Sequence, residues 1–287
     1  MRSIPSVLAV AAIACGADTP RPSPEFRVAA MNAEAPRRSR LAACAPEPDG
    51  RWALPDALAE ASGLAWETDA VLSHGDERGI VYRVTPAGGA VVAATLAGEP
   101  RDDFEGIALA GGRLVLSTSA GRLYLADWPA AGPVAAHRVV ETELGRDCEL
   151  EGLAWDAAAG ALLLPCKQSK GRSRREGVAV RRWHLDRGAP LPDIAISAGA
   201  LEEAGLRSFR PSAIEVDSVT GNWLLLSANP PALLEVSPAG AVVRAAALDS
   251  RHRQPEGLAL TPAGHLLIAD EAAGGTAQLS RYRCPLQ

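Results

Sequence analysis

Three glutamates stand in nearly the same local sequence, and their side chains are the first candidates for chemistry. Glu105, Glu151 and Glu256 are each followed by glycine and an apolar run, in EGIAL, EGLAW and EGLAL. If the fold brings them together, the carboxylates repel one another and the pKa of at least one rises, unless a cation binds between them. Calcium accepts about six to eight oxygen ligands, so the three glutamates predict a calcium site. The alternative is a water-filled ring of carboxylates that cap backbone amides of neighbouring repeats.

The glutamates belong to a longer repeat, and its period indicates the fold. Five segments begin alike, 43, 46, 61 and 44 residues apart, at Ser62, Glu105, Glu151, Ser212 and Glu256. Each start is followed by two or three further short apolar runs separated by turns. Four short strands per unit of about 40–45 residues are typical of a β-propeller blade. The sequence therefore predicts an all-β, five-bladed β-propeller over residues 51–287, with the six tryptophans packing mostly between blades.

Two irregularities of the repeat have local explanations. The segment ALEEAGLRSFR (200–210) lengthens the third interval and predicts a short helix before blade four, with Glu202, Glu203 and Arg207 facing water. The fifth unit contains only three apolar runs before the chain ends. We therefore expect RWALP (51–55) to close the ring as the outermost strand of blade five, antiparallel to 277–283. Such closure removes an open sheet edge.

Several motifs carry a family resemblance across all five repeats. They are DDFEGIAL (102–109), CELEGLAWD (148–156), LLLPCK (162–167), QPEGLAL (254–260) and LLIADE (266–271). As an ordered set, these motifs resemble the SdiA-regulated (YjiK-like) family. The resemblance implies a five-bladed propeller that is commonly exported and carries a calcium site. It implies no particular reaction.

The blade geometry indicates which other side chains surround the three glutamates. In a propeller, the start of the first strand and the end of the second open onto the same face, which we call the mouth. Ser62 and Ser212 fall in the ring at positions where the acidic pattern is broken. The second-strand ends add His74, Asp76, Ser117, Lys167, Asn229, Asp270 and Glu271. This mixed lining suits a small polar or anionic ligand.

Three of the mouth residues are candidates for acid–base chemistry, although each could equally be a solvated loop residue. They are His74, Asp270 and Glu271. Lys167 is important in another way. If it pairs with Glu151, it weakens a nearby cation site because its charge competes with that of the metal.

The N-terminal residues predict export. Residues 1–15 contain one arginine, an apolar stretch and Cys15, which is typical of a signal peptide. AIAC (12–15) resembles a bacterial lipobox, so Cys15 is a predicted lipidation site; plain secretion is the alternative. Residues 16–50 are rich in Pro, Ala and charge and predict a flexible tether. We expect a periplasm-facing or outer-membrane-anchored lipoprotein, with the lipid as its only membrane attachment.

Four further cysteines allow three pairings by spacing alone. The propeller narrows the choice, because a hairpin in blade three brings Cys148 and Cys166 to the same end. The closing strand likewise brings Cys44 close to Cys284. We predict disulfides at both places, with a buried thiol at Cys166 as the alternative.

Composition excludes some functions and leaves two open. The net charge is −5, from 29 basic and 34 acidic residues, so the basic surface of a nucleic-acid-binding protein is missing. No Ser-His-Asp set for nucleophilic catalysis follows from the spacing of these residues. The chain has only three asparagines, so it is short of the neutral side-chain ligands that the cation of a propeller hydrolase typically uses. We expect a monomer that binds calcium and uses this site to hold a small polar ligand or an envelope protein. The alternative is a calcium-dependent hydrolase of an ester, lactone or phosphoester.

Overall fold

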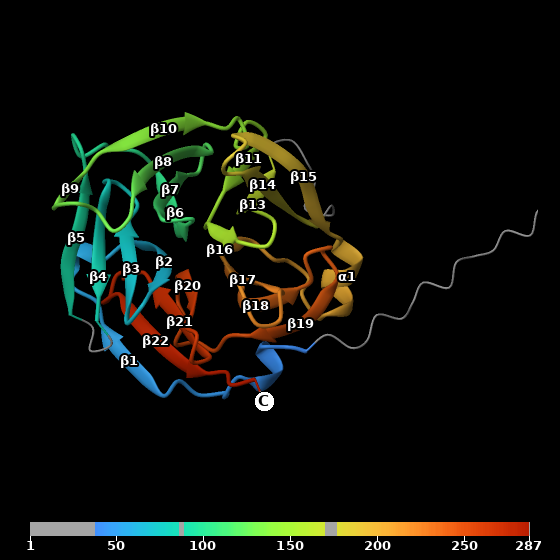
Figure 1. Cartoon of the computed structure of the whole chain (residues 1–287). Coiled ribbons are helices and arrows are strands. Elements are labelled where there is room, and N and C mark those ends of the chain that lie inside the picture. Colours follow the sequence, from blue (N-terminus) through green and yellow to red (C-terminus); the bar gives the residue numbers. More distant parts are fainter. Residues whose placement is uncertain (1–37, 86–88, 170–176, 287) are drawn as a thin grey trace, which may run out of the picture. The chain divides into compact units, whose positions relative to one another are not determined.

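A computed structural model describes residues 38–85, 89–169 and 177–286, all of them in one compact unit. Its strands form five antiparallel sheets that are arranged as blades around a common axis (Figure 1). The predicted all-β, five-bladed β-propeller is therefore confirmed. Residues 1–37, which include the predicted signal peptide and Cys15, lie outside the described residues.

In every blade the strands run in order from the axis to the rim. Blade one contains β2 (Ala61–Glu67), β3 (Ala70–Gly75), β4 (Ile80–Val84) and β5 (Ala90–Leu96). Blade two contains β6 (Phe104–Ala110), β7 (Arg113–Thr118), β8 (Arg122–Asp127) and β10 (His137–Glu141). Blade three contains a divided innermost strand, β11 (Cys148–Leu150) and β12 (Ala154–Asp156), then β13 (Ala161–Ser169), β14 (Val178–His184) and β15 (Ala189–Ile196).

The last two blades follow the same order. Blade four contains β16 (Pro211–Val216), β17 (Trp223–Ala228), β18 (Pro231–Val236) and β19 (Val242–Ala247). Blade five contains β20 (Pro255–Leu260), β21 (His265–Asp270), β22 (Gln278–Arg283) and β1 (Gly50–Ala53). Before blade four lies helix α1 (Ala198–Glu203), which is shorter than the predicted 200–210. Glu202, Glu203 and Arg207 are exposed there, as predicted.

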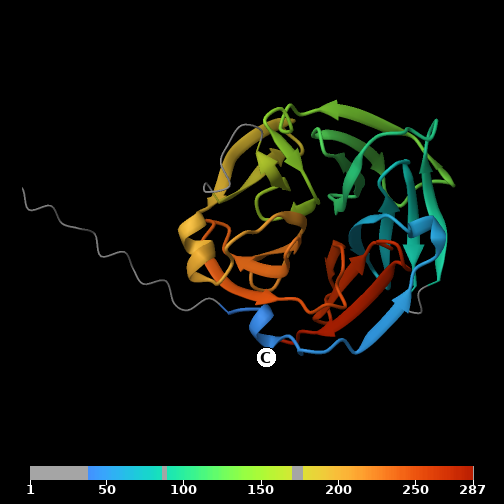
Figure 2. The same ribbon diagram turned by 180° about the vertical axis from the view of Figure 1, so that it is seen from behind.

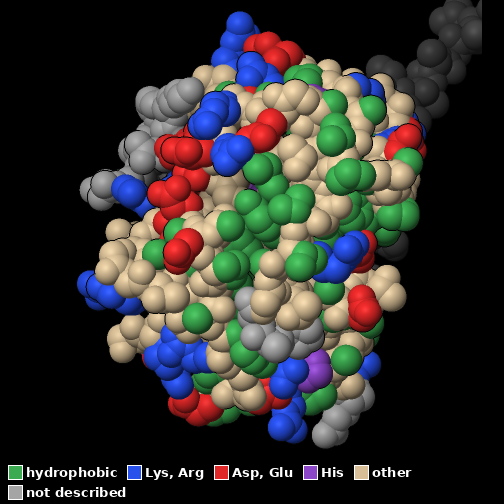
Figure 3. Space-filling model, turned by 90° about the vertical axis from the view of Figure 1, so that its left-hand side faces the viewer, with side chains coloured by type: hydrophobic (Ala, Val, Ile, Leu, Met, Phe, Trp, Pro, Cys, Tyr) green, Lys and Arg blue, Asp and Glu red, His purple; other side chains and the backbone are tan. Residues whose placement is uncertain are grey.

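The core consists of five hydrophobic clusters, and each cluster is shared by two adjacent blades. The inner strands are covered on both faces, so they are continuous apolar runs, such as the fully buried Leu224, Leu225 and Leu226 of β17. All six tryptophans belong to these clusters, as expected. The rim is different: on the side of β5 and of β9 (Val134–Ala135), which pairs with β5 in parallel, apolar side chains reach the surface (Figure 3).

Both ends of the described chain meet in blade five. Strand β1 pairs antiparallel with β22, and Trp52 lies opposite Leu279 (Figures 1 and 2). The Cys44–Cys284 disulfide joins the segments beside this pair, and Cys148–Cys166 joins β11 to β13. Both predicted disulfides are confirmed, and they indicate an exported protein outside the cytoplasm. Among the described residues, no helix has the length and apolar character needed to cross a membrane.

Residues 38–50, the described part of the tether predicted over 16–50, contact the propeller. The segment from Ser39 to Leu41 packs on blade four, where the buried carboxylates of Asp217 and Glu235 receive its hydrogen bonds. Arg40 is only 3% exposed, and its Nη2 lies 2.9 Å from Asp217 Oδ1. We call Ser39, Arg40, Leu41, Asp217 and Glu235 the N-terminal latch. The composition of this segment indicated a solvated tether. It could not indicate these contacts, because the acceptor Glu235 lies 195 residues away from Arg40 in the sequence.

Candidate metal centre

Each innermost strand is interrupted at the residue that the repeat places at the mouth. In blade two, Phe104 pairs with Thr118 and Gly106 with Ser117, so Glu105 is an extra residue on its strand. The equivalent residues of blades one, four and five are likewise extra residues that have no partner in the strand pairing. They are Ser62, Ser212 and Glu256. In blade three, Glu151 lies in the gap between β11 and β12. Such β-bulges turn a side chain out of the normal alternation.

The glycines after the bulges let the innermost strands approach closely. A Cβ on Gly106 would lie 2.6 Å from the carbonyl carbon of Gly152, closer than any real side chain sits. The amide of Gly152, a residue with φ of +77°, donates to the carbonyl oxygen of Glu105 at 2.7 Å. Only glycine fits this contact. The bulges and glycines together hold the mouth glutamates on adjoining strands.

The structure brings the three predicted glutamates together. Glu105, Glu151 and Glu256 each offer a carboxylate oxygen, and these oxygens lie within 4.8 Å of one another. Glu151 and Glu256 are buried, and Glu105 is half-buried. We call these three residues the carboxylate cluster. Ser212, by contrast, donates its hydroxyl to the carbonyl oxygen of Pro255 at 2.7 Å, so it supports the backbone.

The carboxylate cluster does not carry three negative charges easily. Burial, and after it repulsion from Glu151, raises the pKa of Glu105 to about 10. Burial raises the pKa of Glu151 to about 7, although Lys167 acts in the opposite direction. Burial also raises the pKa of Glu256. These are the shifts expected of crowded, desolvated acids that lack enough positive charge nearby.

Lys167 supplies part of that charge. Its Nζ donates to Oε1 of Glu151 at 2.7 Å and lies 3.9 Å from Oε1 of Glu149. The pairing with Glu151 that the sequence raised is therefore present. The second oxygen of Glu151, Oε2, is buried and receives no hydrogen bond from Lys167 or another nitrogen donor among the described residues. A proton on Glu105 lets that acid donate to Glu151, so the two acids need either a shared proton or a cation.

The residues present fit a hard divalent cation such as calcium. Three converging carboxylates offer the oxygen ligands that calcium prefers. Oε2 of Glu151, which receives no bond from a nitrogen donor among the described residues, is the kind of buried acceptor that a bound cation satisfies. Glu105, Glu151 and Glu256 would hold the ion, in competition with Lys167 for one oxygen of Glu151.

Comparison with known proteins identifies the family. The family model described as SdiA-regulated matches residues 51–274. The chain belongs to the SdiA-regulated family. No curated protein matches the sequence.

Solved structures share the fold of this SdiA-regulated chain at low sequence identity. A glutaminyl cyclase from Myxococcus xanthus is 15% identical with a TM-score of 0.56, over 83% of this chain and 95% of that one. A PQQ-bound aldose sugar dehydrogenase from Streptomyces coelicolor is 13% identical with a TM-score of 0.51, over 82% and 98% of the two chains. These similarities concern the fold alone.

In this SdiA-regulated propeller, two of the predicted second-strand residues lie close to the cluster. Burial, followed by repulsion from Glu256, raises the pKa of Glu271 to about 8. Burial, followed by repulsion from Glu60, raises the pKa of Asp76 to about 6. Gln254 donates to both Glu256 and Glu271 and links them. Asp76, Lys167 and Glu271 therefore belong to the mouth together with the carboxylate cluster.

Three of the four other predicted lining residues do not reach the mouth as expected. His74 is fully buried against Phe104, and this burial lowers its pKa to about 4. Asp270 is buried and bonded to His252 at 2.8 Å, and Ser117 is buried as well. Asn229 is exposed in the turn after β17, one residue beyond the position of Lys167, and its place at the mouth stays a prediction. The strand register explains why these predictions differ from the structure. The residues equivalent to Lys167 in the other four blades are Asp76, Ser119, Ala228 and Glu271, whereas the four predicted residues lie one or two positions away from them.

The sequence analysis missed four residues, each two positions before a repeat start, that contact or influence mouth residues. They are Glu60, Asp103, Glu149 and Gln254, and Arg210 has the same position in blade four. Asp103 contributes to the raised pKa of Glu105, and Glu149 lies near Lys167. The signal was available, because counting back two residues from each repeat start gives all five positions.

Proposed function

We propose that the protein is an exported calcium-binding propeller that holds a small polar or anionic ligand, or an envelope protein, at its mouth. The observation that carries this proposal is the convergence of three carboxylates, whose oxygens lie within 4.8 Å of one another. When bound, calcium supplies positive charge that attracts and orients an anionic or polar group. Glu105, Glu151 and Glu256 hold the ion, and the surrounding residues decide from which side a ligand approaches.

The distribution of charge indicates that side. In blades one, two, three and five, the mouth positions include carboxylates. Blade four contributes Arg210, Ser212 and Ala228, none of them acidic, and Lys167 lies on the neighbouring blade three. An anionic group meets least repulsion over blade four, where Lys167 and Arg210 add to the attraction of the cation.

The geometry favours binding over hydrolysis. A hydrolase needs a general acid or base within reach of its substrate. His74 and Asp270, two of the three acid–base candidates, are buried away from solvent, and Asp270 is already bonded to His252. Of the three candidates only Glu271 remains at the mouth, where Asp76 is a second acid with a raised pKa, and no histidine accompanies them among the described mouth residues.

The cellular setting follows from the cysteines. The two disulfides support export, since such bonds persist in oxidising compartments. We place the protein in the bacterial envelope as a monomer, anchored to the outer membrane through lipid on Cys15 and facing the periplasm. Its ligands are then those of the envelope.

Calcium titration tests the proposal. Protein freed of metal with EDTA and then titrated with calcium chloride should bind one ion by calorimetry. At a hundredfold excess over Kd, the free energy of unfolding should rise by about 2.7 kcal/mol, seen as a higher Tm. Glu151→Gln and Glu256→Gln should abolish both effects, whereas Glu202→Gln, on the exposed face of α1, should keep them. An unchanged Tm and no heat of binding at millimolar calcium would refute the site.

A further inference from the structure

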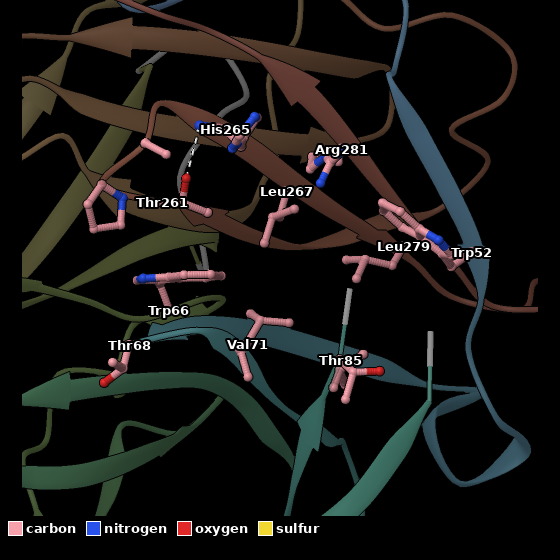
Figure 4. A pocket seen from close by; sticks show the side chains of 14 residues that line it. Trp52, Trp66, Thr68, Val71, Thr85, Thr261, His265, Leu267, Leu279 and Arg281 are labelled. Carbon is pink, nitrogen blue, oxygen red and sulfur yellow. Dashed lines mark hydrogen bonds between the residues drawn. The ribbon is translucent and has the colours of Figure 1, made fainter. Parts of the chain in front are cut away.

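A cavity lies between blades one and five, away from the mouth. It has a volume of about 240 Å³, and side chains of 14 residues line it (Figure 4). Trp66 lies near the end of β2, whereas the mouth residue Ser62 lies at its start. Thr261 likewise follows the end of β20, which begins beside Glu256. The cavity therefore opens at the opposite end of the ring from the carboxylate cluster.

The walls of this inter-blade cavity are mostly apolar. In Figure 4 the indole of Trp66 lies on one side, and Trp52 and Leu279 lie on the other. Val71 of blade one and Leu267 of blade five face the space between them. Concave apolar surfaces of this kind hold the hydrocarbon or aromatic body of a ligand. The volume suits a molecule of on the order of ten non-hydrogen atoms.

The charge on the lining has one sign. None of the lining side chains is acidic or an amide, and the ionisable ones are His265 and Arg281. Arg281 donates from Nε and Nη2 to Asp49, and Arg283 donates to the same carboxylate at 2.9 Å. Two guanidinium groups thus share one carboxylate, which leaves a surplus positive charge beside the cavity. The guanidinium of Arg281 also lies over the ring of Trp52, 5.4 Å from its centroid.

Trp66 forms the wall of the cavity across from Arg281 (Figure 4). Its Nε1 is buried away from the cavity surface, so the indole offers a ligand an apolar face and no hydrogen bond. The charged group within reach of a ligand is therefore Arg281.

We propose that the inter-blade cavity binds a small aromatic carboxylate, with the carboxylate at Arg281 and the ring between Trp66 and Trp52. Carbohydrates fit less well, because their hydroxyl groups are normally held by carboxylate or amide side chains, and the lining has neither. This inference is independent of the calcium site.

The test uses para-hydroxyphenylpropanoate and its neutral amide, titrated calorimetrically into the whole protein in EDTA. For about 12 non-hydrogen atoms, ordinary ligand efficiency gives a Kd of about 1 mM. We expect the carboxylate to bind and the amide to bind at least tenfold more weakly. No binding of the carboxylate, or equal binding of the two, would overturn the proposal. Because EDTA is present, the outcome does not depend on the calcium site.

Two matched pairs of variants locate the site. Arg281→Gln should weaken carboxylate binding at least tenfold, whereas Arg283→Gln, which loses a bond to the same Asp49 outside the cavity, should not. Ala263→Trp, in the lining turn TPAG, should block binding. Ala239→Trp, in the corresponding exposed turn SPAG of blade four, should leave it unchanged. Equal effects within both pairs would place the ligand elsewhere, and the Ala263 pair still decides if Arg281→Gln fails to fold.

Discussion

The N-terminal latch and the carboxylate cluster both bury acids, but they treat them in opposite ways. In the latch, Asp217 accepts two bonds from Arg40, and others from the amide of Val219 and the hydroxyl of Thr220. Although burial opposes ionisation, these donors, Arg40 foremost, hold the pKa of Asp217 below its ordinary value. Glu235 is similarly surrounded by donors from Ser39, Arg40, Leu41 and Asn222.

In the carboxylate cluster the donors are too few. Burial raises the pKa of all three glutamates, and one oxygen of Glu151 receives no hydrogen bond from a nitrogen donor among the described residues. Burial alone therefore does not distinguish a structural acid from a binding acid. The number of donors around each carboxylate does, because a buried acid that the chain leaves unpaired has to be neutralised by a proton or a cation.

The largest expected effect comes from breaking the latch. Arg40→Met leaves Asp217 buried without its cation, and we expect the free energy of unfolding to fall by about 3–5 kcal/mol. Urea unfolding monitored by tryptophan fluorescence measures the change. Arg38→Met, on an exposed neighbouring side chain, should change stability by less than about 0.5 kcal/mol. Equal stability of the two variants would mean that the latch contributes little.

An effect of middle size concerns Glu215, a half-buried acid that pairs with no cation among the described residues. It lines a cavity of about 140 Å³ among the innermost strands, where burial raises its pKa from 4.5 to about 7. The folded state thus holds this proton more tightly than the unfolded state, so stability is full below pH 4.5 and falls as the pH rises to about 7.

Glu215→Gln should remove this dependence on pH. Relative to the variant, the wild type should lose about 2–3 kcal/mol of unfolding free energy between pH 4.5 and 7. Urea unfolding at several pH values measures the difference, with Glu202→Gln as the exposed control. Parallel pH profiles of wild type and Glu215→Gln would show that Glu215 titrates normally.

The smallest expected effect concerns Lys167 and the affinity of the mouth for calcium. Lys167→Met removes the charge that competes for Glu151, so the Kd for calcium should fall roughly tenfold, about 1.4 kcal/mol. Calorimetric titration measures it, and Arg244→Met, on an exposed residue of β19, should leave the Kd unchanged. An unchanged or higher Kd in Lys167→Met would mean that the lysine does not compete with the metal.

The ring of five mouth residues could be predicted because it depends on the repeat alone. A constant period places Glu105, Glu151 and Glu256 at equivalent points of successive blades, and a bulge at each point directs the side chain inward. The disulfides followed from the same register, because hairpin pairing sets which cysteines are neighbours.

The residues at the ends of the second strands were harder to place at the mouth, because their positions also depend on the length of the turn between the first and second strands. A change of one residue turns a side chain to the other face, and this places Asp270 in the core beside His252 and its neighbour Glu271 at the mouth. The latch could not be predicted at all. Its arginine and its acids are about 180 residues apart, and no local pattern links Arg40 to Asp217.

The pairing of β1 with β22 also has a consequence in time. Blade five needs Gly50–Ala53 and Gln278–Arg283 together, so it cannot assemble until both strands have been synthesised. Until then β1 has no partner, and the ring stays open. A chain that ends early keeps unpaired edges, which are the features that proteases and chaperones meet in incomplete proteins. We therefore expect the closure of blade five to be a late step of folding.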